Sequence, residues 1–209
     1  MRQLRLICLP VLLALASLFA CGNALASGGN YRFDGGTPFE QRQVVQALTV
    51  SSFDWSVVPE QITIHIGANL QSEAAPGEIW LDANLLDAGD FSWGVVQHEY
   101  AHQVDFLLFD DAMRAQLDPL LGGTVWFYTV PGLAHGRYGC ERFASTLAWS
   151  YWPSSANSMK PTSGSDESAA MPPAQFRALL ASVLGNASLA AAPLLPSGPV
   201  RAPARPRHR

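Results

Sequence analysis

The chemistry of this chain is concentrated in one run of five residues, His98-Glu99-Tyr100-Ala101-His102. Two histidines four residues apart lie on one face of an α-helix, so both imidazole rings point the same way. Neutral imidazole nitrogens are ligands that Zn²⁺ prefers, and this spacing supplies two of them. Glu99 follows the first histidine, so it can reach a water beside the metal without being a ligand. A carboxylate there takes a proton from the water and later delivers it to the leaving amine of a peptide.

The residues around this run predict a long, buried helix. Apolar residues flank the run on both sides, and neither Gly nor Pro interrupts residues 95–109. The pattern is apolar nearly all round, as expected of a helix inside a domain. We expect this helix to start after an N-cap at Ser92 and to end near Phe109. Two histidines that bind no metal are the alternative, which this helical setting disfavours.

The five-residue run resembles the HExxH motif of the zincin metallopeptidases, and His98, Glu99 and His102 match it position for position. The resemblance covers roughly residues 93–152. It implies an α+β, zincin-like fold in which a small mixed sheet packs on the motif helix, with further helices towards the C-terminus. The metzincin branch is disfavoured, because it needs a glycine three residues after the second histidine and this chain has Asp105 there.

The gluzincin branch takes its third zinc ligand from a glutamate on a later helix, and Glu141 is the candidate. It is the only glutamate between Glu99 and Glu167, and it opens an apolar run over residues 141–152 that predicts a helix. As a ligand it should lie within roughly 4 Å of both imidazole nitrogens, given zinc–oxygen bonds of about 2.0–2.2 Å. Its alternative role is that of an acidic residue favoured by the helix dipole.

Other donors remain open as the third ligand, namely Asp105, Asp110, Asp111, Asp118 and His135. Asp105 lies on the same helical face as the histidines. We expect it to act behind the ligands, by orienting one of them or by bonding the Glu141 helix. Cys140 is expected to be a buried thiol, because a catalytic zinc keeps its fourth position open for water.

Two further groups are expected at a peptidase site. Negative charge develops on the substrate carbonyl oxygen during hydrolysis, and a donor beside the metal stabilises it. The glycine-containing loop 131–139 offers Tyr138 or His135, with Tyr128 as a weaker choice. Under the resemblance, residues 78–81, with Ile79 and Trp80, form an edge strand that pairs with extended substrate. A plain core strand is the alternative.

The remaining elements are readable in outline. Thr37 followed by Pro38 predicts the start of a helix over residues 38–50. Alternating β-branched residues predict a strand over 62–66, and Pro76-Gly77 predicts a turn before the 78–81 strand. Residues 154–170 are expected to be a polar loop, followed by a helix over 172–184.

The two ends of the chain differ in composition from its middle. Residues 1–26 combine two early arginines, a Leu/Ala/Val run and Ala24-Leu25-Ala26, which is typical of a signal peptide cut before Ser27. The alternative is lipidation at Cys21. Residues 27–37 are Gly-rich and are expected to be a flexible lead-in. Residues 186–209 are rich in Ala, Pro and Arg, and we expect a disordered tail. The zincin-like domain is therefore placed at residues 38–185.

Composition limits the functional classes. Apolar residues make up 48% of the 209 and charged residues 14%, which gives enough material for one core and excludes a disordered chain. Seven Lys and Arg against 17 Asp and Glu leave residues 27–192 at a formal charge of −10, which argues against nucleic acid as a partner. After cleavage, Cys140 is the only cysteine, so no internal disulfide is expected.

Together these observations predict an exported zinc-dependent metallopeptidase that is secreted or resides in the periplasm or cell envelope. Zn²⁺ is the expected cofactor and a peptide or protein the expected substrate, with no transmembrane span in the mature chain. The expected ligands are His98, His102 and Glu141, with Glu99 as general base. The alternative is an inactive zinc-binding or envelope interaction module that keeps the fold.

Overall fold

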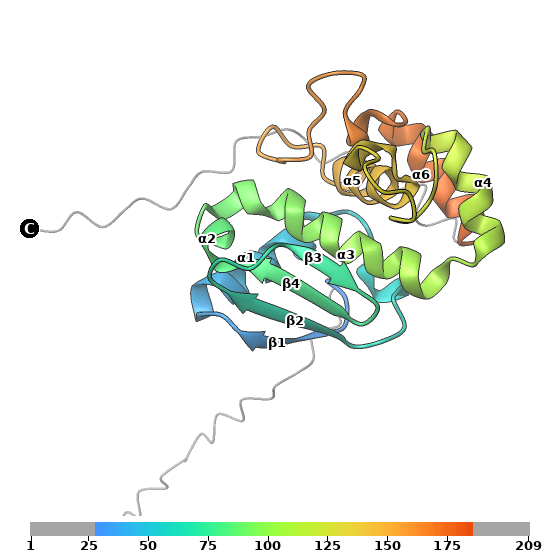
Figure 1. Ribbon diagram of the computed structural model, residues 1–209. Coiled ribbons are helices and arrows are strands. Elements are labelled where there is room, and N and C mark those ends of the chain that lie inside the picture. Colours follow the sequence, from blue (N-terminus) through green and yellow to red (C-terminus); the bar gives the residue numbers. More distant parts are fainter. Residues whose placement is uncertain (1–27, 186–209) are drawn as a thin grey trace, which may run out of the picture.

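The computed structural model describes residues 28–185, which form a mixed α+β domain (Figure 1). The predicted signal peptide, the lipidation alternative at Cys21 and the expected disordered tail lie outside the described residues. Within residues 28–185, no helix is both long and apolar enough to span a membrane. The elements in chain order are β1 (Tyr31–Gly35), α1 (Pro38–Val50), η1 (Trp55–Val57), β2 (Ile62–Gly67), β3 (Glu73–Ala75), β4 (Glu78–Asp82), α2 (Ala83–Leu86), η2 (Gly89–Ser92), α3 (Trp93–Leu108), α4 (Asp111–Leu121), η3 (His135–Arg137), α5 (Gly139–Tyr151), η4 (Glu167–Ala169) and α6 (Pro173–Val183).

A four-stranded mixed sheet forms one layer, with strand order β1-β2-β4-β3. The strands β1, β2 and β4 run parallel, whereas the short β3 pairs antiparallel with β4. The expectation of a flexible lead-in over residues 27–37 is therefore wrong, since residues 31–35 pair along β2. Its glycines end the strand: at Gly35 a Cβ would lie 2.6 Å from the Ile66 carbonyl oxygen, and its φ of +83° suits glycine.

The predicted edge strand is also misplaced. Residues 78–81 form β4, but β4 is paired on both sides, and Ile79 is buried in the core. Trp80 stacks on His65 of β2, with ring centroids 5.1 Å apart. The free edge beside the motif helix belongs to β3, whose three residues lack the β-branched pattern that identifies strands from sequence.

The motif helix α3 lies between the sheet and the C-terminal helices (Figure 1). Its bounds match the prediction, although the Ser92 hydroxyl donates to the Gly89 carbonyl and does not cap the helix. The helix α1 begins with the predicted cap, in which Thr37 and Glu40 form a reciprocal capping box. The helix α4 was not predicted; it contains Pro119 and ends at Gly122, and both residue types disfavour a helix.

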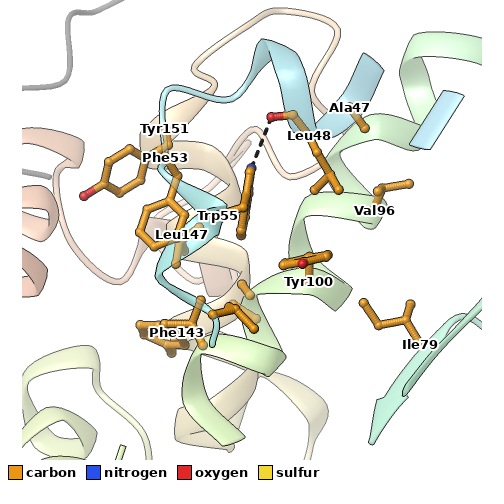
Figure 2. Packing of buried hydrophobic residues seen from close by; sticks show 14 of the residues in the cluster. Ala47, Leu48, Phe53, Trp55, Ile79, Val96, Tyr100, Phe143, Leu147 and Tyr151 are labelled. Carbon is orange, nitrogen blue, oxygen red and sulfur yellow. Dashed lines mark hydrogen bonds between the residues drawn. The ribbon is translucent and has the colours of Figure 1, made fainter. Parts of the chain in front are cut away.

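The core forms where α1, α3 and α5 meet, around a set of aromatic rings (Figure 2). Trp55 lies between Phe53 and Tyr100, with ring centroids 4.7 and 5.2 Å away, and its indole N–H donates to the Leu48 carbonyl at 3.2 Å. Tyr100 lies on α3 between the two motif histidines in sequence, and it is fully buried. The face of α3 that carries Tyr100 is thus fixed in the core, and the histidines are turned to the other side.

Candidate metal centre

Three donor atoms from two helices converge at one point. The distance from His98 Nε2 to His102 Nε2 is 3.2 Å, and Glu141 Oε2 lies 3.1 Å from the first and 3.6 Å from the second. These distances fit one metal ion, because a tetrahedral zinc with bonds of about 2.0–2.1 Å holds its ligand atoms about 3.3 Å apart. All three side chains are at least nine-tenths buried. The donor set therefore fits Zn²⁺ in ligand type and spacing.

Glu99 lies beside these donors, and its carboxylate is within 4.8 Å of donor atoms of both histidines. It is buried, at 6% exposure, and it lines the cavity that opens over the donor set. Burial raises the pKa of Glu99, and the two nearby histidines oppose this rise. A carboxylate with a raised pKa beside the donor set is suited to accept and release a proton.

The two motif histidines keep the carboxyl group of Glu141 ionised. Burial alone would raise the pKa of Glu141, but hydrogen bonds from His102 and His98 hold it well below its usual range. For His98, burial acts to lower the pKa, while the hydrogen bond to Glu141 and the charge of Glu99 outweigh it and raise the pKa. The negative charge of Glu141 in this buried place therefore depends on positive groups around it.

Glu141 reaches the histidines because the segment before α5 is fastened to its N-terminus. The Gly139 and Cys140 N–H groups, which are free at the start of a helix, donate to the carbonyls of Val125 and Trp126 at 2.9 and 3.1 Å. Gly139 must lack a side chain, since a Cβ there would lie 2.2 Å from Asp118 Oδ1 and 2.6 Å from the Trp126 ring.

Asp105 also holds the 125–126 segment in place, through a hydrogen bond with Trp126. It is fully buried and accepts from Arg114 Nε at 2.9 Å and from Trp126 Nε1 at 2.8 Å. Burial raises the pKa of Asp105, against the opposing effect of these two bonds. Within residues 28–185 its side-chain hydrogen bonds reach neither a motif histidine nor α5, so the expectation that it orients a ligand or bonds the Glu141 helix is wrong. Asp105 acts on Glu141 through Trp126.

The structure separates the two predicted carbonyl-oxygen donors. Tyr138 is 3% exposed, and its hydroxyl donates to the Val130 carbonyl at 2.7 Å. It does not line the cavity, so its predicted role is wrong: its hydroxyl is used within the loop. His135 does line the cavity, with Nε2 3.4 Å from Glu141 Oε2. Tyr128 also lines the cavity. The pKa of its hydroxyl is raised, mainly by burial and to a smaller extent by a hydrogen bond with Glu141.

The remaining alternative ligands lie elsewhere. The carboxylate of Asp110 caps α4, Asp111 is fully exposed, and Asp118 lies against Gly123 and Gly139. Cys140 is buried and lines the cavity, and its Sγ lies 3.7 Å from Glu141 Oε1. Burial is the main cause that raises the pKa of this thiol, which keeps it protonated and fits the expected buried thiol.

The cavity has a volume of about 300 Å³, and its lining includes residues 71–74, which contain the start of β3. Phe106 and Phe127 also line it; their rings stack 6.3 Å apart, and Phe106 stacks on His102 as well. Helical spacing signals Phe106, which is one turn beyond His102. The sequence analysis missed this residue, and nothing local in the sequence signals Phe127.

Gln103 is a further residue that sequence reasoning missed. It is fully buried on α3, and its amide donates to the Ala75 and Glu78 carbonyls at 2.9 and 3.0 Å. Its amide oxygen accepts from the Gly77 N–H at 2.9 Å. One side chain next to His102 therefore fixes the β3–β4 turn, and with it the free edge of the sheet, over the cavity.

Comparison with known proteins adds no relative. Searches against protein-family models, curated proteins and solved structures gave no match. The functional conclusion therefore rests on the geometry of the site.

Proposed function

We propose that this protein is a zinc-dependent peptidase with a zincin-like fold of the gluzincin kind. The observation that carries the proposal is the convergence of His98 Nε2, His102 Nε2 and Glu141 Oε2 to between 3.1 and 3.6 Å, with Glu99 beside them. A pair of histidines and a glutamate would hold Zn²⁺ at three positions. When bound, the ion would act as a Lewis acid that polarises a carbonyl and lowers the pKa of water.

The chain itself supplies the other parts of a hydrolytic site. Glu99 accepts the proton of the attacking water and passes it to the leaving amine. His135, with Nε2 turned into the cavity, donates to the oxygen on which negative charge develops. The free edge of β3 offers backbone groups to an extended peptide, in place of the predicted 78–81 strand. A peptide is the substrate that fits a donor set placed next to an open strand edge.

Two measurements test this function. Zinc content after purification in zinc-containing buffer should be one ion per chain. Cleavage of an unfolded protein such as reduced casein should fall by about 100- to 10,000-fold in Glu99→Gln, the range for loss of a general base, with zinc still bound. Glu40→Gln is the matched control: Glu40 is a buried glutamate in the α1 capping box, where glutamine also serves.

The outcomes separate the two functional classes. Equal cleavage by the natural chain and Glu99→Gln would refute the proposed mechanism. One bound zinc with no cleavage by either chain would instead identify a zinc-binding module. A chain that binds no zinc would overturn both.

A further inference from the structure

Glu167 lies behind the candidate metal centre, in a segment whose sequence suggests only a polar loop. Both of its carboxylate oxygens are engaged by side chains of the site. Oε1 accepts from His135 Nδ1 at 2.6 Å, and Oε2 accepts from the Ser145 hydroxyl at 3.0 Å. Its side chain is 25% exposed, so it lies between the cavity wall and the surface. One carboxylate thus contacts two polar groups that approach it from different elements.

Ser145 connects this carboxylate to a metal ligand. It lies on α5 one helical turn after Glu141 and is 2% exposed, with Oγ 3.0 Å from His98 Nδ1. A hydroxyl has one proton, and the charged Glu167 is a stronger acceptor than the Met159 sulfur that lies 3.7 Å from the same Oγ. Because that proton goes to Glu167, the hydroxyl oxygen is left to accept from His98 Nδ1–H.

This direction of hydrogen bonding suits the tautomer of His98 that binds a metal. With a metal bound, His98 would use the lone pair of Nε2 at the point where His102 and Glu141 converge, and its proton would be on Nδ1. Without a metal, Nε2 lies 3.1 Å from Glu141 Oε2 and can donate to that carboxylate. The chain from His98 through Ser145 to Glu167 therefore prepares this ring for a metal.

The second branch orients His135. Its Nδ1 bond to Glu167 turns Nε2 towards the cavity, although the side chain is 58% exposed and otherwise lightly held. We propose that Glu167 is a positioning residue for both histidines: through Ser145 it fixes His98 as a metal ligand, and directly it fixes the orientation of His135, with Nε2 towards the cavity. The part concerning His135 rests on the proposed function, whereas the part concerning His98 rests only on metal binding.

Ser145→Ala breaks one branch and leaves the other intact. In the zinc-loaded protein, NMR should show the His98 Nδ1–H as a hydrogen-bonded, slowly exchanging proton, and the variant should shift this signal and speed its exchange, with His135 unchanged. Zinc affinity, measured by competition with a chelator, should fall about 10- to 100-fold, as for other residues behind a metal ligand. Ser150→Ala is the control, since Ser150 is an equally buried serine of α5 whose hydroxyl has no partner in the described part of the chain.

Glu167→Gln tests the sharing itself. An amide has one acceptor and one donor end, so either orientation reverses one of the two hydrogen bonds and disturbs the orientation of one histidine. The variant should therefore lose about 10- to 100-fold either in zinc affinity or in kcat at saturating zinc. Asp166→Asn is the control for loop stability, because Asp166 holds the same loop through Thr162 and Ser163 but does not bond to His135 or Ser145.

The outcomes distinguish this inference from the proposed function. An unchanged His98 Nδ1–H signal and unchanged zinc affinity in both variants would overturn it, even if the natural chain cleaves peptides. An Asp166→Asn variant that reproduces the Glu167→Gln losses would also overturn it, because loop stability alone would then explain them. The expected changes in the His98 signal and in zinc affinity, in a chain that cleaves no peptide, would refute the peptidase function but support the positioning of His98.

Discussion

The two helices that provide the candidate metal donors position them by different means. On α3 the spacing of His98 and His102 is set by the helix itself, and any regular helix at this place keeps their ring nitrogens close. On α5 the single donor Glu141 is in the first turn, where backbone N–H groups lack partners within the helix. Its position depends on Val125, Trp126 and, one step further away, Asp105.

This difference teaches where the site is vulnerable. Mutations in the core beneath α3 should reduce stability without changing the spacing of the histidine donors. Mutations that loosen the 125–126 segment should shift Glu141 and weaken metal binding, even though they lie away from the donors. Remote effects on metal affinity are therefore expected on the α5 side of the centre and not on the α3 side.

The largest effect is expected from removing a donor. Glu141→Ala and His102→Ala should each lower zinc affinity by more than about 100-fold, because losses behind the ligands alone cost 10- to 100-fold. Chelator competition at fixed pH provides the measurement, with Asp111→Ala as a control at an exposed acidic residue. Zinc affinity preserved in Glu141→Ala would show that α5 contributes no ligand, and the comparison would lose its basis.

The sequence made the α3 side predictable for a physical reason. The helix period alone sets the relative positions of His98, Glu99 and His102, so a run of five consecutive residues is enough to predict that they lie close together. Most helices also followed from periodicity and caps, such as Thr37 followed by Pro38 at α1, whereas the α+β class was implied by the family resemblance. These features depend on contacts within a few residues.

The parts that were missed depend on distant contacts. The strand β1 was hidden in a Gly-rich stretch because its stability comes from pairing with β2. The three-residue β3 has no strand signal of its own and is fixed by Gln103 from α3. Tyr138 was chosen by residue type and loop position, and only the structure shows that its hydroxyl bonds to the Val130 carbonyl.

A second prediction sharpens the comparison with two neighbouring residues of α3. Asp105→Asn should destabilise the fold by about 3 kcal/mol, because it leaves the Arg114 charge without its buried partner. Val104→Ala should cost about 2 kcal/mol through a cavity in the core. Urea unfolding measures both losses. Only Asp105→Asn should also weaken zinc binding, because it alters the hydrogen bond to Trp126, whose carbonyl accepts from the N–H group of Cys140 next to Glu141. Equal zinc affinities in the two variants would contradict the dependence of Glu141 on that segment.

The smallest effect is expected at Gly139, where the α5 side can be strained without removing a polar contact. Gly139→Ala places a methyl group 2.6 Å from the Trp126 ring and 2.2 Å from Asp118 Oδ1, so the start of α5 or these side chains must shift. Overpacking of this kind costs about 1–3 kcal/mol. Because the shift occurs two residues before Glu141, zinc affinity should fall with stability.

Gly77→Ala, at a turn where a Cβ meets nothing within 4 Å, is the control for glycine strain, since φ is +81° there. That control should lose stability and keep its zinc affinity. If Gly139→Ala behaved in the same way, the start of α5 would be free to move without moving the donor, and the N-terminal contacts of this helix would not be what positions Glu141.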